Sequence, residues 1–297
     1  MGKAISTAES NAVLHRELDA FNRERLTPTA QRTQWRERLE RGLAMELVER
    51  EWIERERAAV APLLRSVPSE ANAFVGWFES LAASGPGQGD PLFPWLAKHA
   101  TKAEMRWFLQ QERAGEAGFD DLVALTQVKL PTAAKLELGR NYWDELGRGR
   151  EVAMHGPMLE RLAFALELDT DQTPVWESLA LANLMSALAC HRDLAFQSVG
   201  ALGAIELTAP ARCEQINAGL RRLGVEGHAR KYYAVHATMD VRHSTTWNRE
   251  AIAPLVAEDP ARALAIAEGA LLRLRAGARC FERYRHELWA EAAAPAA

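Results

Sequence analysis

Apolar side chains recur at helical spacing along most of the chain, and alternating strand patterns bounded by tight turns are nearly absent. The first such stripe lies in a segment rich in Arg and Glu, which can pair along a helix. Its apolar members are Trp35, Leu39, Leu43, Leu47 and Ile53. We therefore expect an N-terminal helical arm over residues 1–70. Either it packs on the body of the protein, or it forms a homodimer.

The remaining residues, 71–297, predict one all-α bundle. A loop is expected over 82–94, and its G-x-G-x-G does not predict a dinucleotide site because no strand precedes it. Helices are expected over 102–126, 132–146, 150–167, 174–208, 210–223, 227–249 and 259–289. The segment 174–208 is too long for one straight helix, and we expect a bend near His191–Asp193.

Composition narrows the class of protein. Of 297 residues, 48% are hydrophobic and 26% charged, the balance of an ordinary globular chain. A net charge of −4 lacks the basic footprint of a nucleic-acid binder. The longest charge-free apolar stretch, Ser178 to Cys190, is shorter than the ~20 residues that cross a bilayer. With no signal-peptide pattern and three scattered cysteines, we expect a cytoplasmic protein that binds a small molecule, not nucleic acid or membrane.

Carboxylates interrupt the apolar faces at several places. In 102–126, Glu112 and Glu116 fall on the face that carries Met105, Phe108 and Leu122. Charge on such a face is costly unless it is paired or bound to a metal ion. Glu112 therefore either pairs with an arginine of a neighbouring helix or serves as a ligand. Glu206, between apolar or small helical neighbours, is a clearer case, although a solvated helix end before Pro210 is the alternative.

Glu145 and His155 are separated by ten residues that include Gly147 and Gly149. In a regular helix their side chains would lie roughly 80° apart, so contact between them requires a local bulge. Further along the chain, His236, Asp240 and His243 occupy positions i, i+4 and i+7 and share one helical face. Imidazole with carboxylate suits iron, zinc or manganese.

Taken together, the charges of these residues would balance those of two metal ions. The four carboxylates carry −4 and two divalent iron ions carry +4, while three imidazoles complete the coordination without adding charge. The carboxylates are Glu112, Glu145, Glu206 and Asp240, and the imidazoles are His155, His236 and His243. Buried carboxylates without a cation would be too costly. A ferritin-like bundle is disfavoured because no Glu-x-x-His occurs in the chain.

The pattern over roughly residues 90–250 resembles the haem-oxygenase-like di-iron oxidases and oxygenases, also called iron-containing redox enzymes. The resemblance rests on Trp107–Glu112, Asn141–Glu145, His155, Gly203–Glu206 and the His-x-x-x-Asp-x-x-His at 236–243. It implies a seven-helix haem-oxygenase-like bundle that binds two iron ions rather than haem. Such enzymes use O2 as co-substrate and oxidise amines, amino acids or fatty acids by N-oxygenation, C–C cleavage or decarboxylation.

The resemblance also implies the metal ligands, which are Glu112, Glu145, His155, Glu206, His236, Asp240 and His243. Glu116 is an alternative to Glu112, one turn along the same stripe. We assign Glu112, Glu145, His155 and His243 to one iron and the other three ligands to the second. The substrate pocket is expected near Trp107, Phe108, Tyr142, Trp143, Tyr233 and Trp247, unless these pack in the core. Arg113 and Arg242 are candidates for a substrate carboxylate, unless they form surface ion pairs.

Two other hypotheses remain open. One is a metal-free enzyme of the same fold, thiaminase-like or quinone-cofactor-forming, which would use a cysteine or a histidine-lined pocket. Against it, none of Cys190, Cys213 and Cys280 lies beside a matched ligand in the sequence. The other is a non-enzymatic helical partner protein, which needs no polar groups on its inner faces.

Overall fold

The computed structural model describes residues 7–30, 33–168 and 173–290, and every regular element in these ranges is helical. Parts of the expected arm, at 1–6 and 31–32, lie outside the described residues. The longer helices are α1 (Thr7–Leu26), α2 (Trp35–Val60), α3 (Ala71–Ser84), α4 (Leu92–Lys98), α5 (Lys102–Gly115), α6 (Phe119–Thr126), α7 (Thr132–Glu145), α8 (His155–Ala165), α9 (Trp176–Cys190), α10 (Ala195–Arg222), α11 (Lys231–Thr246), α12 (Ala253–Glu258) and α13 (Arg262–Ala290). Short 3-10 turns connect some of them: η1 (Ala61–Ser66), η2 (Gly147–Gly149), η3 (Glu151–Ala153) and η4 (Arg192–Leu194). A π-helical turn, η5 (Trp247–Ile252), joins α11 to α12.

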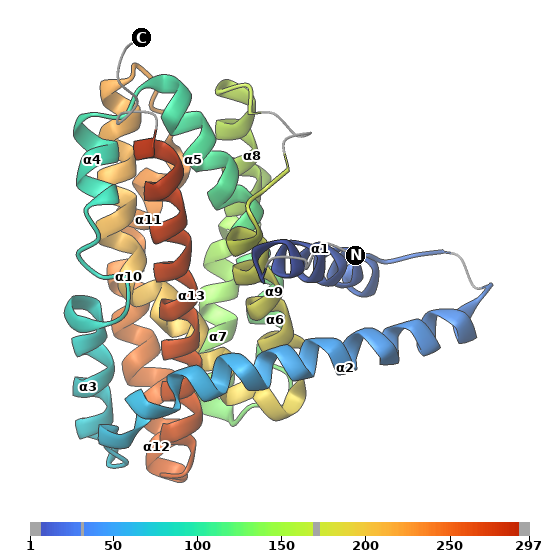
Figure 1. Ribbon diagram of the computed structural model, residues 1–297. Helices are drawn as coiled ribbons and strands as arrows, with labels where there is room; N and C mark the ends of the chain where they lie inside the picture. The colour runs from blue at the N-terminus through green and yellow to red at the C-terminus, as the bar shows by residue number, and fades with distance from the viewer. Residues whose placement is uncertain (1–6, 31–32, 169–172, 291–297) are drawn as a thin grey trace.

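The helix α10 packs against both α11 and α13 (Figure 1). The α10 and α13 backbones approach closely because glycines face the partner helix. A Cβ at Gly200 would overlap the carbonyl of Ile266, and a Cβ at Gly269 would overlap that of Gln197. Around α10 the core is closed by large side chains such as Trp247, which is fully buried. The segment that carries Glu206 is therefore rigidly held.

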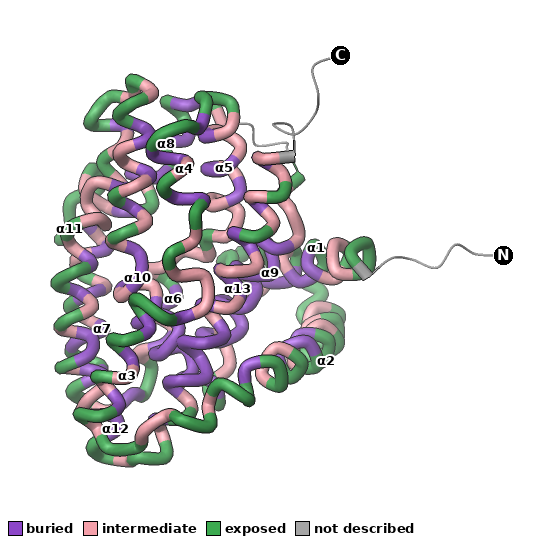
Figure 2. Tube along the Cα trace, turned by 60° about the vertical axis from the view of Figure 1, so that its left-hand side comes forward, coloured by how far each residue is buried: buried purple, intermediate pink, exposed green. Residues whose placement is uncertain are grey.

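The N-terminal arm crosses the bundle instead of extending it. The helix α1 packs on α9, and α2 runs outward from α13 at one side of the bundle (Figure 1). Four members of the α2 stripe are exposed, namely Trp35 (56%), Leu39 (66%), Leu43 (61%) and Leu47 (60%), whereas Ile53 is buried. Figure 2 shows mainly exposed and intermediate positions along α2. Packing on the body therefore accounts only for the C-terminal part of the stripe. The homodimer and the domain boundary at residue 70 stay predictions.

A buried ion cluster, which we call the arm anchor, fixes α1 and α2 to the bundle. It consists of Arg25, Glu49 and His191. The carboxylate of Glu49 is fully buried, accepts two hydrogen bonds from Arg25 at 2.9 and 3.0 Å, and lies 2.7 Å from His191 Nε2. A second link joins α1 to α9, because Asn183 donates to the carbonyl of His15 and accepts a hydrogen bond from Asn22.

Several predicted elements need correction. The helix α4 begins inside the expected loop 82–94, α12 lies outside every expected helix, and the helix expected over 150–167 begins only at His155. The expected helix 102–126 breaks after Gly115, because Gly118 adopts a left-handed conformation (φ 77°) and begins α6. The helix expected to end at 208 instead continues as α10 through Pro210, which has no N–H to donate to the carbonyl of Glu206. The bend near His191–Asp193 is confirmed, because α9 ends at Cys190 and α10 begins at Ala195.

None of the described helices combines the length and the apolar character needed to cross a bilayer.

Candidate metal centre

A tight turn brings Glu145 and His155 together. Glu145 is the last residue of α7 and His155 the first of α8, and the Glu145 carboxylate lies 2.6 Å from His155 Nδ1. The bulge expected between them is a complete break, formed by η2 and η3. Gly147 (φ 60°) is required there, because a Cβ would overlap the backbone of Ala153.

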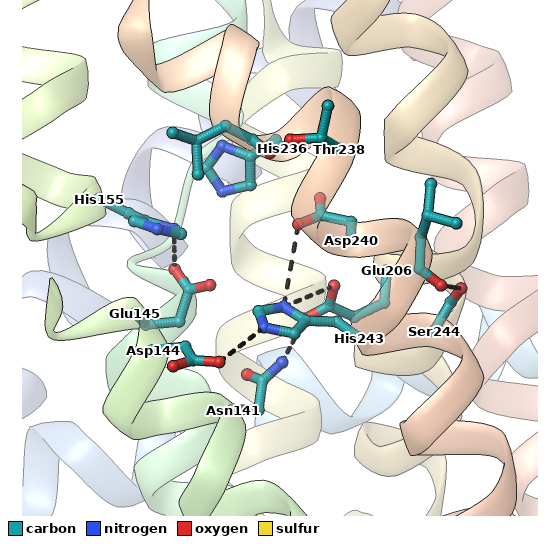
Figure 3. A network of polar contacts seen from close by, with 12 residues as sticks. Asn141, Asp144, Glu145, His155, Glu206, His236, Thr238, Asp240, His243 and Ser244 are labelled. Carbon is teal, nitrogen blue, oxygen red and sulfur yellow. Dashed lines mark hydrogen bonds and ion pairs between the residues drawn. The ribbon is translucent and has the colours of Figure 1, made fainter. Parts of the chain in front are cut away.

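Glu206 reaches the same place from α10, and its side chain is only 2% exposed. One carboxylate oxygen accepts a hydrogen bond from the Asn141 amide at 2.5 Å, and the other lies 3.4 Å from His243 Nδ1 (Figure 3). Glu206 is thus buried in the middle of a helix, which excludes the solvated helix end considered above.

The three α11 residues face this group as their spacing predicts. His236 Nδ1 donates to the Tyr232 carbonyl at 2.8 Å, and the two rings of His236 and His155 meet edge to face at 4.5 Å. His243 Nε2 lies 3.2 Å from the Asp144 carboxylate, which leaves Nδ1 facing Glu206 (Figure 3). A hydrogen bond from the outer ring nitrogen to a carbonyl or carboxylate is typical of metal-binding histidines, since it fixes ring orientation and tautomer.

Two sets of ligand atoms each lie within 4.8 Å of one another among the described residues. One set is Glu145, His155 and His236, and the other is Glu145, Glu206 and His243. Glu145 belongs to both sets. This grouping differs from the predicted division, which put His243 with His155 and His236 with Glu206. Asp240 adjoins the second set, with its carboxylate 3.9 Å from His243 Nδ1.

Burial dominates the electrostatics of this cluster. It raises the pKa of Glu145 and of Asp240 well above their usual values, and the charge of Glu206 adds to both effects. Burial also lowers the pKa of His155 and of His236 to about 4, so both imidazoles are neutral. Burial acts to lower the pKa of His243 as well, but the neighbouring Glu206 and Asp144 raise it to about 9. The unmetallated cluster therefore retains protons that a metal ion would displace.

The donor set fits a cation because several of its polar atoms are buried without a hydrogen-bond partner. They are Glu206 Oε2, Asp240 Oδ1, His155 Nδ1 and His243 Nδ1, whose nearest charged neighbours are one another and Glu145. Buried polar atoms in proteins are nearly always partnered, so a group of such orphans at one place indicates a missing ligand. Carboxylate and imidazole are donors that suit iron.

The structure places the two first-helix candidates differently. Glu112 lies away from the centre, near Arg212, Arg273 and Tyr284. Neither set of ligand atoms includes it. Glu116 lies in the loop after α5, where it accepts the Phe119 N–H at 3.1 Å and faces the cavity described next.

A cavity of about 130 Å³ adjoins the cluster. Its polar wall is formed by Glu116, Asp120, Glu145, His155, Glu206, His236 and Asp240, and its apolar wall includes Phe119, Leu122, Leu159, Met185 and Ile205. Tyr232, Cys213 and Arg273 also line the cavity. The cavity is thus polar at the cluster and apolar elsewhere, as a substrate site requires.

The comparisons with known proteins agree with this geometry. A model of the iron-containing redox enzyme family matches residues 106–278. The chain belongs to the iron-containing redox enzyme family. Among solved structures, it is similar to a domain of unknown function with a heme oxygenase-like fold from Shewanella denitrificans, at 14% identity and a TM-score of 0.53 over 74% of this chain and 93% of that chain. No curated protein matches the chain.

Membership makes this chain an iron-containing oxidoreductase, and the similar structure confirms the predicted haem-oxygenase-like all-α fold. None of the six aromatic residues expected near the substrate pocket lines this cavity, and for three of them the alternative of packing in the core holds. Phe108, Tyr233 and Trp247 are buried in the core, and Trp143 is 52% exposed.

Four residues of this iron-containing redox enzyme escaped the sequence analysis. Asp144 and Asn141 position His243 and Glu206, and their place beside Glu145 on α7 was the only local signal for them. Asp120 and Arg273 line the cavity without any motif. The candidates Arg113 and Arg242 do not reach it: Arg113 pairs with Glu160, and Arg242 is exposed.

Proposed function

We propose that this protein is a non-haem di-iron oxidase or oxygenase that uses O2 to oxidise a small amine-, amino-acid- or fatty-acid-like metabolite. The observation that carries the proposal is the shared position of Glu145. Its carboxylate belongs to two ligand sets, so it would bridge two ions. His155 and His236 would complete one site, and Glu206, Asp240 and His243 the other.

The protein's contribution is position and protonation. The Tyr232 carbonyl and the Asp144 carboxylate each hold one histidine by its outer nitrogen, so the inner nitrogen is presented to the metal ion. Asn141 orients Glu206 in the same way. The apolar wall excludes water from the cavity, and the bound iron would supply the reduction of O2.

Anaerobic titration with Fe(II), followed by removal of loose metal and measurement of iron per chain, tests the proposal. We expect two ions per chain, and uptake of O2 with a transient visible absorption band when O2 is admitted. His236→Ala should load less iron and lose the O2 uptake. Glu145→Ala should lose both ions, because its carboxylate belongs to both sets. Wild-type loading in Glu145→Ala would refute the bridging role.

A matched pair of variants decides the first-helix ligand. Glu116→Gln should reduce iron loading, because Glu116 lines the cavity beside the cluster. Glu112→Gln serves as the control and should load as the wild type does, because Glu112 belongs to neither ligand set and does not line the cavity. The opposite result would restore Glu112 as the ligand.

The structure bears on the thiol-based alternative in two opposing ways. Cys213 does line the cavity, although its sequence position gave no sign of this. However, burial and the charge of Asp240 raise the pKa of the Cys213 thiol strongly, so it stays protonated and is a poor nucleophile. A non-enzymatic helical protein would not need the buried polar cluster at all.

A further inference from the structure

Arg273 is a partly buried cation that forms no ion pair with any described carboxylate. It projects from α13 into the wall of the cavity. Its Nε is buried without a hydrogen bond, and no described carboxylate forms an ion pair with it. Gly277, one turn later, leaves room for the guanidinium, since Nη1 lies 2.9 Å from where a Cβ would be. A guanidinium remains charged in a protein, so its position demands an anion.

The neighbouring Arg212 shows what a satisfied arginine looks like in the same region. Its Nη1 donates to the Thr208 hydroxyl at 3.1 Å, and its guanidinium lies over the rings of Phe93 and Phe281. Glu112 is the carboxylate whose charge acts on Arg212. Arg212 does not line the cavity.

The carboxylates nearest to Arg273 indicate what kind of partner it lacks. Two carboxylates, Glu112 and Glu116, act on it through their charge without touching it. Glu112 is shared with Arg212 and Tyr284, and Glu116 faces the metal cluster, where its charge also acts on Glu145. Neither carboxylate forms an ion pair with Arg273, so its guanidinium faces the cavity without a directly bound anion.

We infer that Arg273 binds the anionic end of the substrate, and that the substrate is a small monocarboxylate with an apolar body. The inference rests on the proposed function only in taking this cavity as the substrate chamber. The carboxylate pairs with Arg273, the body lies along Leu122, Leu159 and Ile205, and the carbon to be oxidised is presented to the metal cluster. Arg273 is a binding residue that sets specificity and orientation.

The test uses metal-free protein, so that a carboxylate bound directly to iron does not obscure the result. Isothermal titration calorimetry at pH 7 compares hexanoate with hexan-1-ol and hexylamine, which have the same apolar body. We expect hexanoate to bind at least about tenfold more tightly than either, because a charge-assisted hydrogen bond is worth one to two orders of magnitude in affinity. Equal affinity for hexan-1-ol would overturn the inference.

Variants locate the anion. Arg273→Met should weaken hexanoate binding about ten- to a hundredfold, and Arg273→Lys should weaken it less, because a lysine keeps the charge but not the two-pronged geometry. Arg212→Met is the matched control and should bind hexanoate as the wild type does. Without ligand, Arg273→Met should unfold at a higher temperature than wild type, because an unpaired and partly buried charge is removed. Unchanged hexanoate affinity in both Arg273 variants, or a lower unfolding temperature for Arg273→Met, would contradict the inference.

Iron loading separates this inference from the proposed function. If the wild type binds two iron ions but the Arg273 variants bind hexanoate as tightly as it does, the di-iron proposal stands and this inference is refuted. If the protein binds hexanoate through Arg273 but takes up no iron, this inference stands and the di-iron proposal is refuted.

Discussion

Two buried carboxylate clusters in this molecule differ in how they are neutralised. In the arm anchor, Glu49 is enclosed by Arg25 and His191, so the charges cancel within the protein. In the metal centre, Glu145, Glu206 and Asp240 are equally buried, yet no arginine or lysine forms an ion pair with them within the described residues. Only His243, with its raised pKa, offsets part of this charge.

The difference separates a structural role from a functional one. Burying a carboxylate costs free energy in both places, and the arm anchor recovers it with its own cations. In the metal centre, no described side chain fully offsets this cost. Such an arrangement persists in a protein only where a bound ligand offsets it. The two clusters should therefore respond to neutralisation with opposite signs.

Removal of the anchor carboxylate is expected to have the largest effect. Glu49→Ala leaves the partly buried Arg25 without its carboxylate, so the free energy of unfolding should fall by about 3 kcal/mol. Urea denaturation measures the change. The control is Asp193→Ala, which removes the partner of Arg50 from an exposed pair and should cost at most about 1 kcal/mol. Equal losses in the two variants would mean that the anchor is no stronger than a surface pair.

The corresponding change in the metal centre should stabilise the metal-free protein. The pKa of Asp240 is raised in the folded state, so ionising this carboxyl group costs free energy in the folded protein but not in the unfolded chain. Asp240→Asn removes this penalty and should raise the free energy of unfolding by about 1–3 kcal/mol at pH 7. The advantage should shrink as the pH falls below the raised pKa of the folded state, and it should vanish only below the ordinary pKa of 3.8, where both states hold the proton.

Iron should reverse the sign of the Asp240→Asn effect. With Fe(II) bound anaerobically, the wild type gains stability from its ligand and the variant gains less, because an amide is a weaker donor than a carboxylate. Thermal unfolding with and without Fe(II) measures both effects. A variant that is destabilised without metal would show that Asp240 is structurally satisfied like Glu49.

The sequence pattern predicts much of the fold and of the cluster, for physical reasons. Helical periodicity marks the bundle, and regular spacing on one helix places His236, Asp240 and His243 on a common face. Glu206 is conspicuous because nothing near it in the sequence can neutralise it. These features depend on local geometry and composition, which can be derived from the residues alone.

Other features depend on tertiary packing and were missed. The left-handed turn at Gly118 redirects Glu116 toward the cavity, although the segment reads as one continuous helix. Arg273 lies in an arginine-rich helix, and only the packed structure distinguishes it from Arg275 and Arg279, which pair with Glu56. Periodicity likewise reveals the α2 stripe but not what covers it.

The arm supplies the last test, through a histidine that is buried without a carboxylate. His15 is 1% exposed and stacks on Trp176, with Trp52 at its edge. Burial, with the charges of Arg279 and Arg55, lowers the pKa of His15 to about 3. Below pH 6.5 the unfolded chain therefore binds a proton that the folded protein refuses, and stability falls by up to about 1.4 kcal/mol per pH unit.

The pH dependence of unfolding isolates this contribution. Between pH 6 and 5, the loss of unfolding free energy should be about 1 kcal/mol smaller in His15→Gln than in the wild type, because the variant has no imidazole to protonate. His228→Gln is the control, since His228 is exposed and its removal should leave the slope unchanged. If His15→Gln kept the wild-type slope, the acid sensitivity would have to arise elsewhere, and the arm would be held by its ion cluster rather than by the packing of a neutral imidazole between two indoles.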